Sequence, residues 1–257
     1  MSLSLSLSLQ ERTFFYEMGY LVIENMLSPK ELEEYTAIYN RFLSGDINTG
    51  KNRSDLGAGL GDGVKEAITQ IMWPSDFVPK LLDMPYHIRM RMIAKELLGP
   101  DIEMDFDMLI NKAPFTNTET PWHQDAAYWI NMPDKRAFSS WLALDNATID
   151  NGCMWYIPGS HLQPIRPHRF AGAEGGALMC DGKEEEGVCV PLQPGACVIH
   201  QGGTLHYSRG NTSPDSRRAF IINFRPQEMI DLERKQGFDH GRNGNSADRK
   251  PRNTETK

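Results

Sequence analysis

The sequence predicts a mainly β fold with flanking helices, of the β-sandwich or jelly-roll class. Helical patterns are confined to residues 10–100, strand-like runs fill residues 101–228, and turn signals rich in Gly, Pro and Asn separate those runs. Early helices followed by many short strands are typical of a β core that carries its helices on one outer face. Because the helices alone could not bury a second core, we expect one domain over residues 10–228.

The opening combines one strand and two helices. The apolar run 20–23 predicts a short strand. Ser28 is followed by a proline and, three residues later, by a glutamate, which is a capping signal for a helix that ends at Gly45. Helical spacing returns over residues 85–98 and stops at a Gly-Pro pair. Residues 44–63 are rich in Gly, Asn and Asp, which predicts a mobile loop of the kind that often covers a site.

The β part begins with a run in which apolar and acidic residues alternate, over residues 104–110. Period-2 alternation is the pattern of a half-buried strand. Further strand-like runs follow at 126–130, 138–144, 153–157, 196–199 and 219–224. These runs supply the strands of the predicted jelly roll.

Composition narrows the partners and the compartment. A formal net charge of −7 and a pI near 5.5 argue against a nucleic-acid surface, which needs a basic face. Residues 1–9 alternate Leu and Ser without the features of a signal peptide or a membrane span, so we expect a flexible leader and no membrane partner. Four cysteines without metal-binding spacing favour free thiols in the cytoplasm. The polar residues 229–257 predict a partly disordered tail.

His123 and Asp125 form the first candidate site. In an extended segment, residues two apart project from one face, so both side chains can reach one metal ion while Gln124 points away. A second imidazole would complete two histidines and one carboxylate, the arrangement of non-haem Fe(II) oxygenases. A His-x-Asp triplet often arises by chance, so its value depends on the third ligand.

The third ligand must be one of the other six histidines. Four of them lie in the second helix, after turns or in the tail, and are poorly placed to face a strand: His87, His161, His168 and His240. His200 and His206 remain, one on each side of a Gly-Gly bend. Position does not separate these two, and both stay candidates on this reasoning.

Four motifs, in order along the chain, resemble those of the phytanoyl-CoA dioxygenase family. They are the strand 108–112 (MLINK), the triplet 123–125 (HQD), the segment 151–161 (NGCMWYIPGSH) and the run 206–224 that begins HYSRGN. The resemblance covers residues 10–228 and implies a double-stranded β-helix core. It also implies an oxygenase that depends on Fe(II) and uses 2-oxoglutarate and O2 as co-substrates.

The resemblance also assigns the metal ligands. His123, Asp125 and His206 are similar to the iron ligands of the family, which decides against His200. The implied reaction is hydroxylation of an unactivated C–H bond of a small organic molecule, with release of succinate and CO2. Asp125 favours hydroxylation, since related halogenases carry a small residue at this position. The alternative is a jelly-roll protein that binds a metal or small ligand without turnover, which would be expected to lack a ligand or the co-substrate arginine.

The co-substrate residues are implied in the same way. Arg217 lies eleven residues after His206 and matches the arginine that binds the far carboxylate of 2-oxoglutarate, with Arg218 as its rival. A guanidinium suits this task because its planar fork matches a carboxylate. Four further residues match positions near the co-substrate: Ser208, Trp141, Met108 and Gln124. For the tryptophan and the methionine, core packing is the alternative.

The small-molecule substrate is not identified by the sequence. Tyr128 and Trp129 follow the metal triplet and are candidates to line its pocket. Four basic residues could favour an anionic substrate: Lys112, Arg166, His168 and Arg169. The alternative is that the two aromatic residues belong to the core and that the basic residues face solvent. The pattern does not define an oligomeric state.

Overall fold

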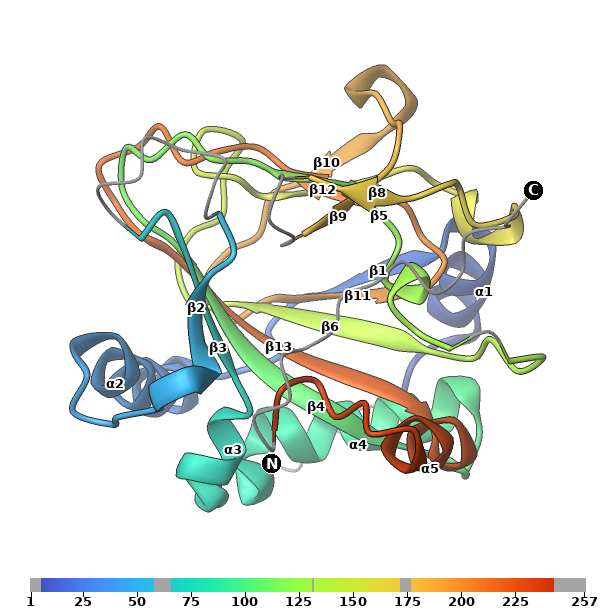
Figure 1. Cartoon of the computed structure of the whole chain (residues 1–257), viewed down its shortest axis with the longest axis horizontal. Coiled ribbons are helices and arrows are strands. Elements are labelled where there is room, and N and C mark those ends of the chain that lie inside the picture. The colour runs from blue at the N-terminus through green and yellow to red at the C-terminus, as the bar shows by residue number, and fades with distance from the viewer. Residues whose placement is uncertain (1–5, 58–65, 131, 172–176, 243–257) are drawn as a thin grey trace.

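Two antiparallel β-sheets face each other, and helices cover the outer face of the larger sheet (Figure 1). The computed structural model describes residues 6–57, 66–130, 132–171 and 177–242. The predicted fold class, a mainly β jelly roll with flanking helices, is confirmed. The four cysteines form no disulfide, as their spacing predicts.

The larger sheet contains seven strands. Their bounds are β1 Tyr20–Ile23, β2 Arg53–Asp55, β3 Ile68–Met72, β4 Ile102–Lys112, β6 Phe138–Ala143, β11 Cys197–Gln201 and β13 Arg217–Pro226. They lie side by side in the order β1-β11-β6-β13-β4-β3-β2, and the central strand β13 pairs with both β4 and β6.

The smaller sheet contains four short strands and lies above the larger one in Figure 1. Its members are β5 Thr120–His123, β7 Met154–Tyr156, β10 Val188–Val190 and β12 His206–Ser208, in the order β10-β7-β12-β5. A separate two-stranded ribbon is formed by β8 Arg169–Phe170 and β9 Leu178–Met179. The inner faces of the two main sheets enclose the space in which the candidate site lies.

Five α-helices occur among the described residues: α1 Leu9–Met18, α2 Pro29–Ser44, α3 Pro74–Phe77, α4 Pro85–Leu98 and α5 Gln227–Lys235. Side chains of α1, α2 and α4 form one apolar cluster with the outer face of the larger sheet, for example Phe15, Tyr39 and Ile93 with Phe220. Figure 1 shows α3 and α4 below this sheet and α2 at its lower left, on the side away from the smaller sheet. No helix in the described part of the chain is long and apolar enough to cross a bilayer.

The predicted helix after Ser28 is confirmed as α2. The Ser28 backbone N–H donates to the Glu31 carboxylate at 2.8 Å, and the Glu31 N–H donates back to the serine hydroxyl at 3.4 Å. Gly45 ends the helix with φ at +86°, a left-handed conformation that glycine adopts without strain. The second predicted helix, over residues 85–98, is confirmed as α4.

Alternation along β13 explains how one strand serves both the core and the site. Phe220, Ile222 and Phe224 belong to the apolar cluster under the helices. Ala219 and Ile221 belong to the cluster between the two sheets. Successive side chains of a strand point to opposite faces, so the odd-numbered residues from 217 to 225 face the inner space. The Arg217 end and the Arg225 end of this row border two different parts of that space.

Both chain ends differ from the sequence-based expectation. Leu7 is buried, Ser8 caps α1 and Leu9 begins that helix, so the expected leader already forms part of the fold at residues 7–9. The tail expected after residue 228 also begins as packed structure, because α5 continues to Lys235 and Glu233 is fully buried. The polar composition hides this packing, because the ion pair of Glu233 with Arg225 is buried together with Met229 and Ile230. Residues 1–5 and 243–257 lie outside the described residues.

The predicted strand over residues 126–130 is wrong: Asp125–Ala127 forms a 3₁₀ turn, in which the Tyr128 N–H donates to the Asp125 carbonyl. A short apolar run fits a turn buried against other elements as well as a strand, so periodicity alone could not separate them. Of the predicted mobile loop 44–63, residues 53–55 form β2, and residues 58–65 lie outside the described residues.

Candidate metal centre

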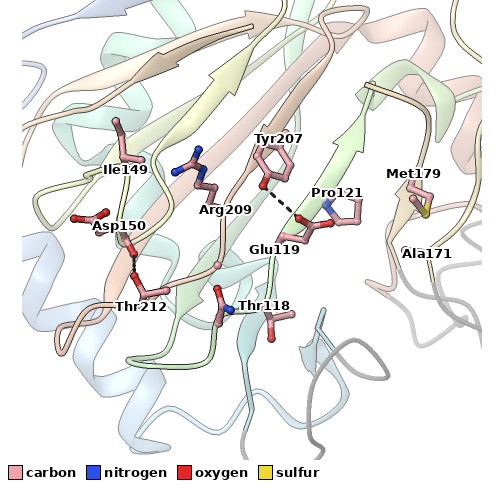
Figure 2. A pocket seen from close by; sticks show the side chains of 12 residues that line it. Thr118, Glu119, Pro121, Ile149, Asp150, Ala171, Met179, Tyr207, Arg209 and Thr212 are labelled. Carbon is pink, nitrogen blue, oxygen red and sulfur yellow. Dashed lines mark hydrogen bonds between the residues drawn. The ribbon is translucent and has the colours of Figure 1, made fainter. Parts of the chain in front are cut away.

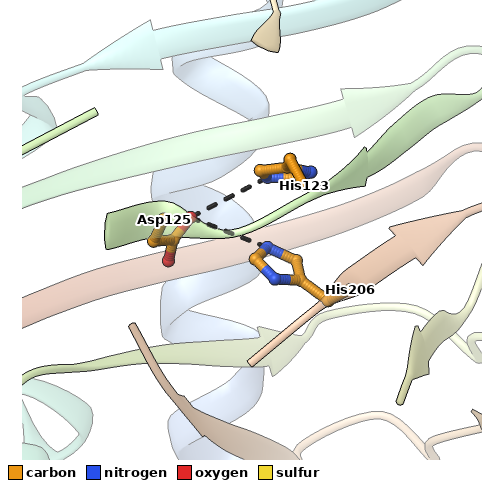
Figure 3. Close-up of side chains that lie close together, drawn as sticks. All are labelled: His123, Asp125 and His206. Atoms are coloured by element: carbon orange, nitrogen blue, oxygen red, sulfur yellow. Dashed lines mark ion pairs between the residues drawn. The ribbon is translucent and has the colours of Figure 1, made fainter. Parts of the chain in front are cut away.

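Two imidazoles and one carboxylate converge inside the jelly roll (Figure 3). His206 on β12 lies directly opposite His123 on β5, and Asp125 follows two residues after β5 ends. The Asp125 Oδ1 atom lies 3.8 Å from His123 Nε2 and 3.6 Å from His206 Nε2. Ligand atoms bound to one metal at about 2.1 Å and at right angles lie about 3 Å apart, so a small contraction would give a complete ligand set.

Backbone carbonyls orient both imidazoles. His123 Nδ1 lies 2.7 Å from the Pro121 carbonyl, and His206 Nδ1 lies 2.9 Å from the Thr204 carbonyl. A carbonyl only accepts, so each Nδ1 carries the proton and each Nε2 offers its lone pair to the centre. Burial lowers the pKa of both imidazoles, which favours the neutral form that binds metal.

His200, the other candidate for the third ligand, contacts Asp125 instead of completing the triad. Its Nε2 lies 3.3 Å from Asp125 Oδ2, and the Tyr156 hydroxyl lies 3.2 Å from its Nδ1. When that hydroxyl donates to Nδ1, the proton of His200 is on Nε2 and points at the carboxylate. Ser139 Oγ donates to the same Oδ2 at 2.5 Å. The two oxygens of Asp125 are therefore distinct: Oδ1 faces the ligand imidazoles and Oδ2 is held by the protein.

The charge of Asp125 is well supported. Burial raises the pKa of this carboxyl, but the imidazoles of His206, His200 and His123 and the hydrogen bond with His200 outweigh burial. Its pKa therefore lies below the usual range, and the group is a carboxylate at neutral pH.

We expect Ser139→Ala and His200→Gln each to weaken metal binding about tenfold, because a ligand that loses its outer hydrogen bond is no longer fixed in orientation. Titration of the metal-free protein with Co(II), followed by absorption, measures the affinity. Ser140→Ala is the matched control, since the Ser140 hydroxyl points to the other face of β6 and donates to the Ile222 carbonyl. Equal affinities in all three variants would show that Oδ2 needs no support.

Arg217 is a buried cation without a counter-ion among the described residues. It is 1% exposed, and no described group accepts a hydrogen bond from its guanidinium or forms an ion pair with it. The Trp141 ring lies beside it, with the ring centre 5.1 Å from the guanidinium carbon. Burial lowers the pKa of Arg217 to about 10, so the side chain stays charged at neutral pH. A buried, unpaired charge is costly, and it indicates that an anion is bound here when the protein works.

One internal cavity of about 160 Å³ joins the metal ligands to Arg217. Most of the predicted site residues line it together: His123, Asp125, His206, Arg217, Ser208, Trp141, Met108, Tyr128 and Trp129. Arg218, the rival to Arg217, faces the other way and pairs with Asp145 at 2.5 Å.

Two predicted contacts do not face this cavity. The Gln124 side chain donates to the Gly203 carbonyl at 2.7 Å and accepts from the Arg166 N–H at 2.9 Å, so it joins two loops behind the triad. Lys112 is fully buried and donates to the carbonyls of residues 118, 208 and 209. Its three donors are all used, and we assign it a structural role.

The other basic residues proposed for the substrate are also engaged by the protein. Arg166 donates to the Asp181 carbonyl at 2.6 Å and pairs with Glu186 at 3.1 Å. Arg169 pairs with Asp181 at 3.1 Å. His168 Nε2 accepts from the Gln124 N–H at 3.0 Å, and burial lowers the pKa of this imidazole to about 4. None of the three lines the cavity as described, which removes the basis for an anion site built from them.

Several lining residues were missed. Gln70 on β3 lies 3.4 Å from the Met108 sulfur, and Ser139 contacts Asp125. Alternation on the neighbouring strands could have suggested both, because Gln70 and Ser139 occupy inward positions in register with β4 and β13. Phe238 and His240 also line the cavity, but they follow α5, and no local pattern in the sequence marks them.

A second hollow, of about 680 Å³, lies on the outer face of the smaller sheet (Figure 2). Tyr207 lines it because this residue alternates with the inward-facing His206 and Ser208. Two of its charged groups have partners: Glu119 accepts from the Tyr207 hydroxyl at 3.3 Å, and Arg209 pairs with Glu184. None of the metal or co-substrate candidates lines it, so the chemistry belongs to the internal cavity.

Comparison with known proteins agrees with this geometry. A model of the family described as phytanoyl-CoA dioxygenase (PhyH) matches residues 15–219. The peroxisomal phytanoyl-CoA dioxygenase of Bos taurus is 28% identical over 242 residues, which cover 85% of this chain and 68% of the relative. The structure of EvdO2 from Micromonospora carbonacea var. aurantiaca, complexed with 2-oxoglutarate, is 29% identical with a TM-score of 0.70, and the match covers 85% of this chain and 91% of that one.

A more distant structure shares the fold alone. It is the epimerase SnoN in complex with Fe3+, alpha ketoglutarate and nogalamycin RO, which is 24% identical with a TM-score of 0.67. The match covers 84% of this chain and 82% of SnoN. Because SnoN is an epimerase, the fold serves reactions other than hydroxylation.

Proposed function

The chain belongs to the phytanoyl-CoA dioxygenase family, and from this premise we propose that it is an oxygenase that hydroxylates a C–H bond of a small molecule with Fe(II), 2-oxoglutarate and O2. The observation that carries the proposal is one cavity that holds both a two-histidine, one-carboxylate set and a buried arginine without a counter-ion among the described residues. The set is typical of non-haem iron, and the arginine calls for an anion.

The donor atoms of His123, Asp125 and His206 fit Fe(II). Two neutral imidazoles and one carboxylate occupy one side of an ion and leave the opposite side for other ligands. The bound iron, with O2 and 2-oxoglutarate, would supply an oxidant strong enough for an unactivated C–H bond and would release succinate and CO2. The protein holds the three ligands rigid, through the Pro121 and Thr204 carbonyls and through the contacts at Asp125 Oδ2.

We assign Arg217 to the far carboxylate of 2-oxoglutarate. Ser208, Trp141 and Met108 line the same cavity, and the Trp141 ring covers one side of the guanidinium. A carboxylate that is buried against this arginine would gain a charge-assisted, bidentate hydrogen bond. EvdO2, which shares this fold, has been solved in complex with 2-oxoglutarate, which supports the same ligand here.

Asp125 favours hydroxylation over halogenation. Asp125 occupies the carboxylate position, so no space is left beside the imidazoles for a halide ligand. An alternative is a different oxidative outcome, such as epimerisation, the reaction for which SnoN is named. Product analysis separates the two, because hydroxylation adds one oxygen atom to the substrate and epimerisation adds none.

The purified protein with Fe(II), ascorbate and 2-oxoglutarate is expected to form succinate slowly even without its prime substrate. The reason is that the side chains of this protein alone form the metal site and the co-substrate site, so neither site needs the prime substrate to be bound. Succinate can be measured by chromatography, with a metal-free sample as the control. If iron binds and no succinate appears with any candidate substrate, the chain is a non-catalytic metal-binding member of the family.

A further inference from the structure

The segment after α5 supplies a wall of the active-site cavity. Phe238 and His240 line it together with the metal ligands, although they follow the last core strand by more than ten residues. Arg217 and Arg225 occupy the same inward face of β13, eight residues and about 26 Å apart along the strand. Arg217 marks the co-substrate end. The segment that packs on Arg225 therefore borders the end left for the prime substrate.

Buried ion pairs hold this wall in place. Arg225 is fully buried, donates to Glu233 at 2.5 Å and also pairs with Asp105. Its guanidinium carbon lies 4.8 Å from the centre of the Trp129 ring, and the Ile130 N–H donates to Glu233 at 2.8 Å. The cluster thus ties α5 to β4 and fixes Trp129, another residue of the cavity.

His240 is fixed by the same cluster. Its Nε2 lies 3.0 Å from Asp105 Oδ2, and its ring lies between Phe106 at 4.2 Å and Phe238 at 4.7 Å. Its backbone is left-handed, with φ at +53°, a conformation that is uncommon for residues other than glycine. Such a conformation persists only where the surroundings hold it, and this placement brings the imidazole to the cavity.

The charges of the cavity restrict what can enter it. Among the described lining residues, only Asp125 and Arg217 carry fixed charge. A divalent metal with Asp125, and a doubly negative 2-oxoglutarate with Arg217, leave the loaded site neutral. Arg225, just behind the wall, is already paired with two carboxylates. A charged group of the substrate would therefore meet no opposite charge among the described lining residues, and its burial without a partner would be unfavourable.

We propose that Phe238 and His240 determine substrate specificity, and that the part of the prime substrate that enters this cavity is an uncharged ring. The inference rests on the proposed function. Four aromatic side chains line this part of the cavity and offer flat apolar faces to such a ring: Phe106, Tyr128, Trp129 and Phe238. The imidazole of His240 adds one polar group, which suits a hydroxyl or amide substituent.

The test uses matched ring compounds and the full chain loaded with Co(II) and 2-oxoglutarate. Benzamide is compared with benzoate, and cyclohexanecarboxamide with cyclohexanecarboxylate, by the change in the Co(II) absorption bands. We expect each amide to bind at least about tenfold more tightly than its carboxylate. Equal or tighter binding of the carboxylates, or no binding of either amide, would overturn the inference while the proposed function stands. Failure of the unaltered protein to bind Co(II) or 2-oxoglutarate would refute both.

Variants of Phe238 and His240 test whether these two residues cause the preference for the amides. Phe238→Ala and His240→Gln are expected to weaken amide binding at least about fivefold, with the dissociation constant of 2-oxoglutarate within about twofold of the original. Phe238→Leu keeps an apolar side chain, so its affinity for the amides should lie between that of Phe238→Ala and that of the original protein. Leu162→Ala, at a residue that is 67% exposed, is the control and should change neither constant. Unchanged amide binding in both wall variants, or an equal loss of amide and 2-oxoglutarate binding, would contradict a role in specificity.

Discussion

Asp125→Ala is expected to abolish metal binding and, with it, the formation of succinate. Asp125 is the one carboxylate of the described triad, and its Oδ1 lies within 4 Å of both ligand imidazoles. Without it the two imidazoles remain, and they would hold a divalent ion at least about 100-fold more weakly. Loss of a residue that only hydrogen-bonds to a ligand already lowers metal affinity about 10 to 100-fold, and Asp125 is itself a ligand. Calorimetric titration with Fe(II) under anaerobic conditions measures the affinity, and succinate release measures turnover.

Variants of His206 and His200 should differ in metal binding, because only His206 belongs to the ligand triad. His206→Ala should lose the metal as Asp125→Ala does, whereas His200→Gln should retain it with reduced affinity, because His200 acts through Asp125. Asp125→Glu keeps the charge, but its longer side chain cannot keep both the Ser139 contact and the ligand position. Full activity in the Asp125→Ala variant, or loss of metal in His200→Gln alone, would refute the assignment of ligands.

Local patterns predicted those elements that local interactions determine. The capping box at Ser28 and the apolar spacing of residues 85–98 define α2 and α4 without help from the rest of the chain. The turn at Asp125–Ala127 was mistaken for a strand because hydrogen bonds to distant residues hold it, such as that from the Ala126 N–H to the Gly202 carbonyl. Sequence spacing does not contain such contacts.

In the candidate site too, local patterns predicted some residues, and contacts between distant residues decided the others. The His123 and Asp125 pair could be predicted from alternation, and the resemblance chose His206, which the structure places opposite His123. The basic residues were expected near the substrate because the sequence does not show which group a charged side chain contacts. Lys112 donates to three carbonyls, and Arg166 donates to the Asp181 carbonyl and pairs with Glu186. The wall after α5 was missed for the converse reason, since buried ion pairs make its composition resemble that of a solvated tail.

Arg217→Met is expected to weaken 2-oxoglutarate binding at least about 30-fold, because the loss of one partner of a buried, hydrogen-bonded charge pair costs roughly 2 to 5 kcal/mol. The same change should stabilise the ligand-free protein by about 1 to 3 kcal/mol, since it replaces a buried charge that has no described counter-ion with an apolar side chain of similar length. Arg217→Lys keeps a charge without the planar fork, and its affinity for 2-oxoglutarate should be intermediate. Binding is measured by calorimetry and stability by urea unfolding.

The neighbouring arginine provides a control of opposite sign. Arg218 pairs with Asp145 through two of its nitrogens, at 2.5 and 2.9 Å, and does not line the cavity. Arg218→Met should therefore lower the stability of the ligand-free protein slightly and leave the affinity for 2-oxoglutarate unchanged. If Arg217→Met instead destabilises the ligand-free protein as Arg218→Met does, then Arg217 has a structural partner, and its unpaired charge is no longer an argument for a dicarboxylate. Gain of stability together with loss of 2-oxoglutarate binding would show that this charge is kept in the core for its ligand.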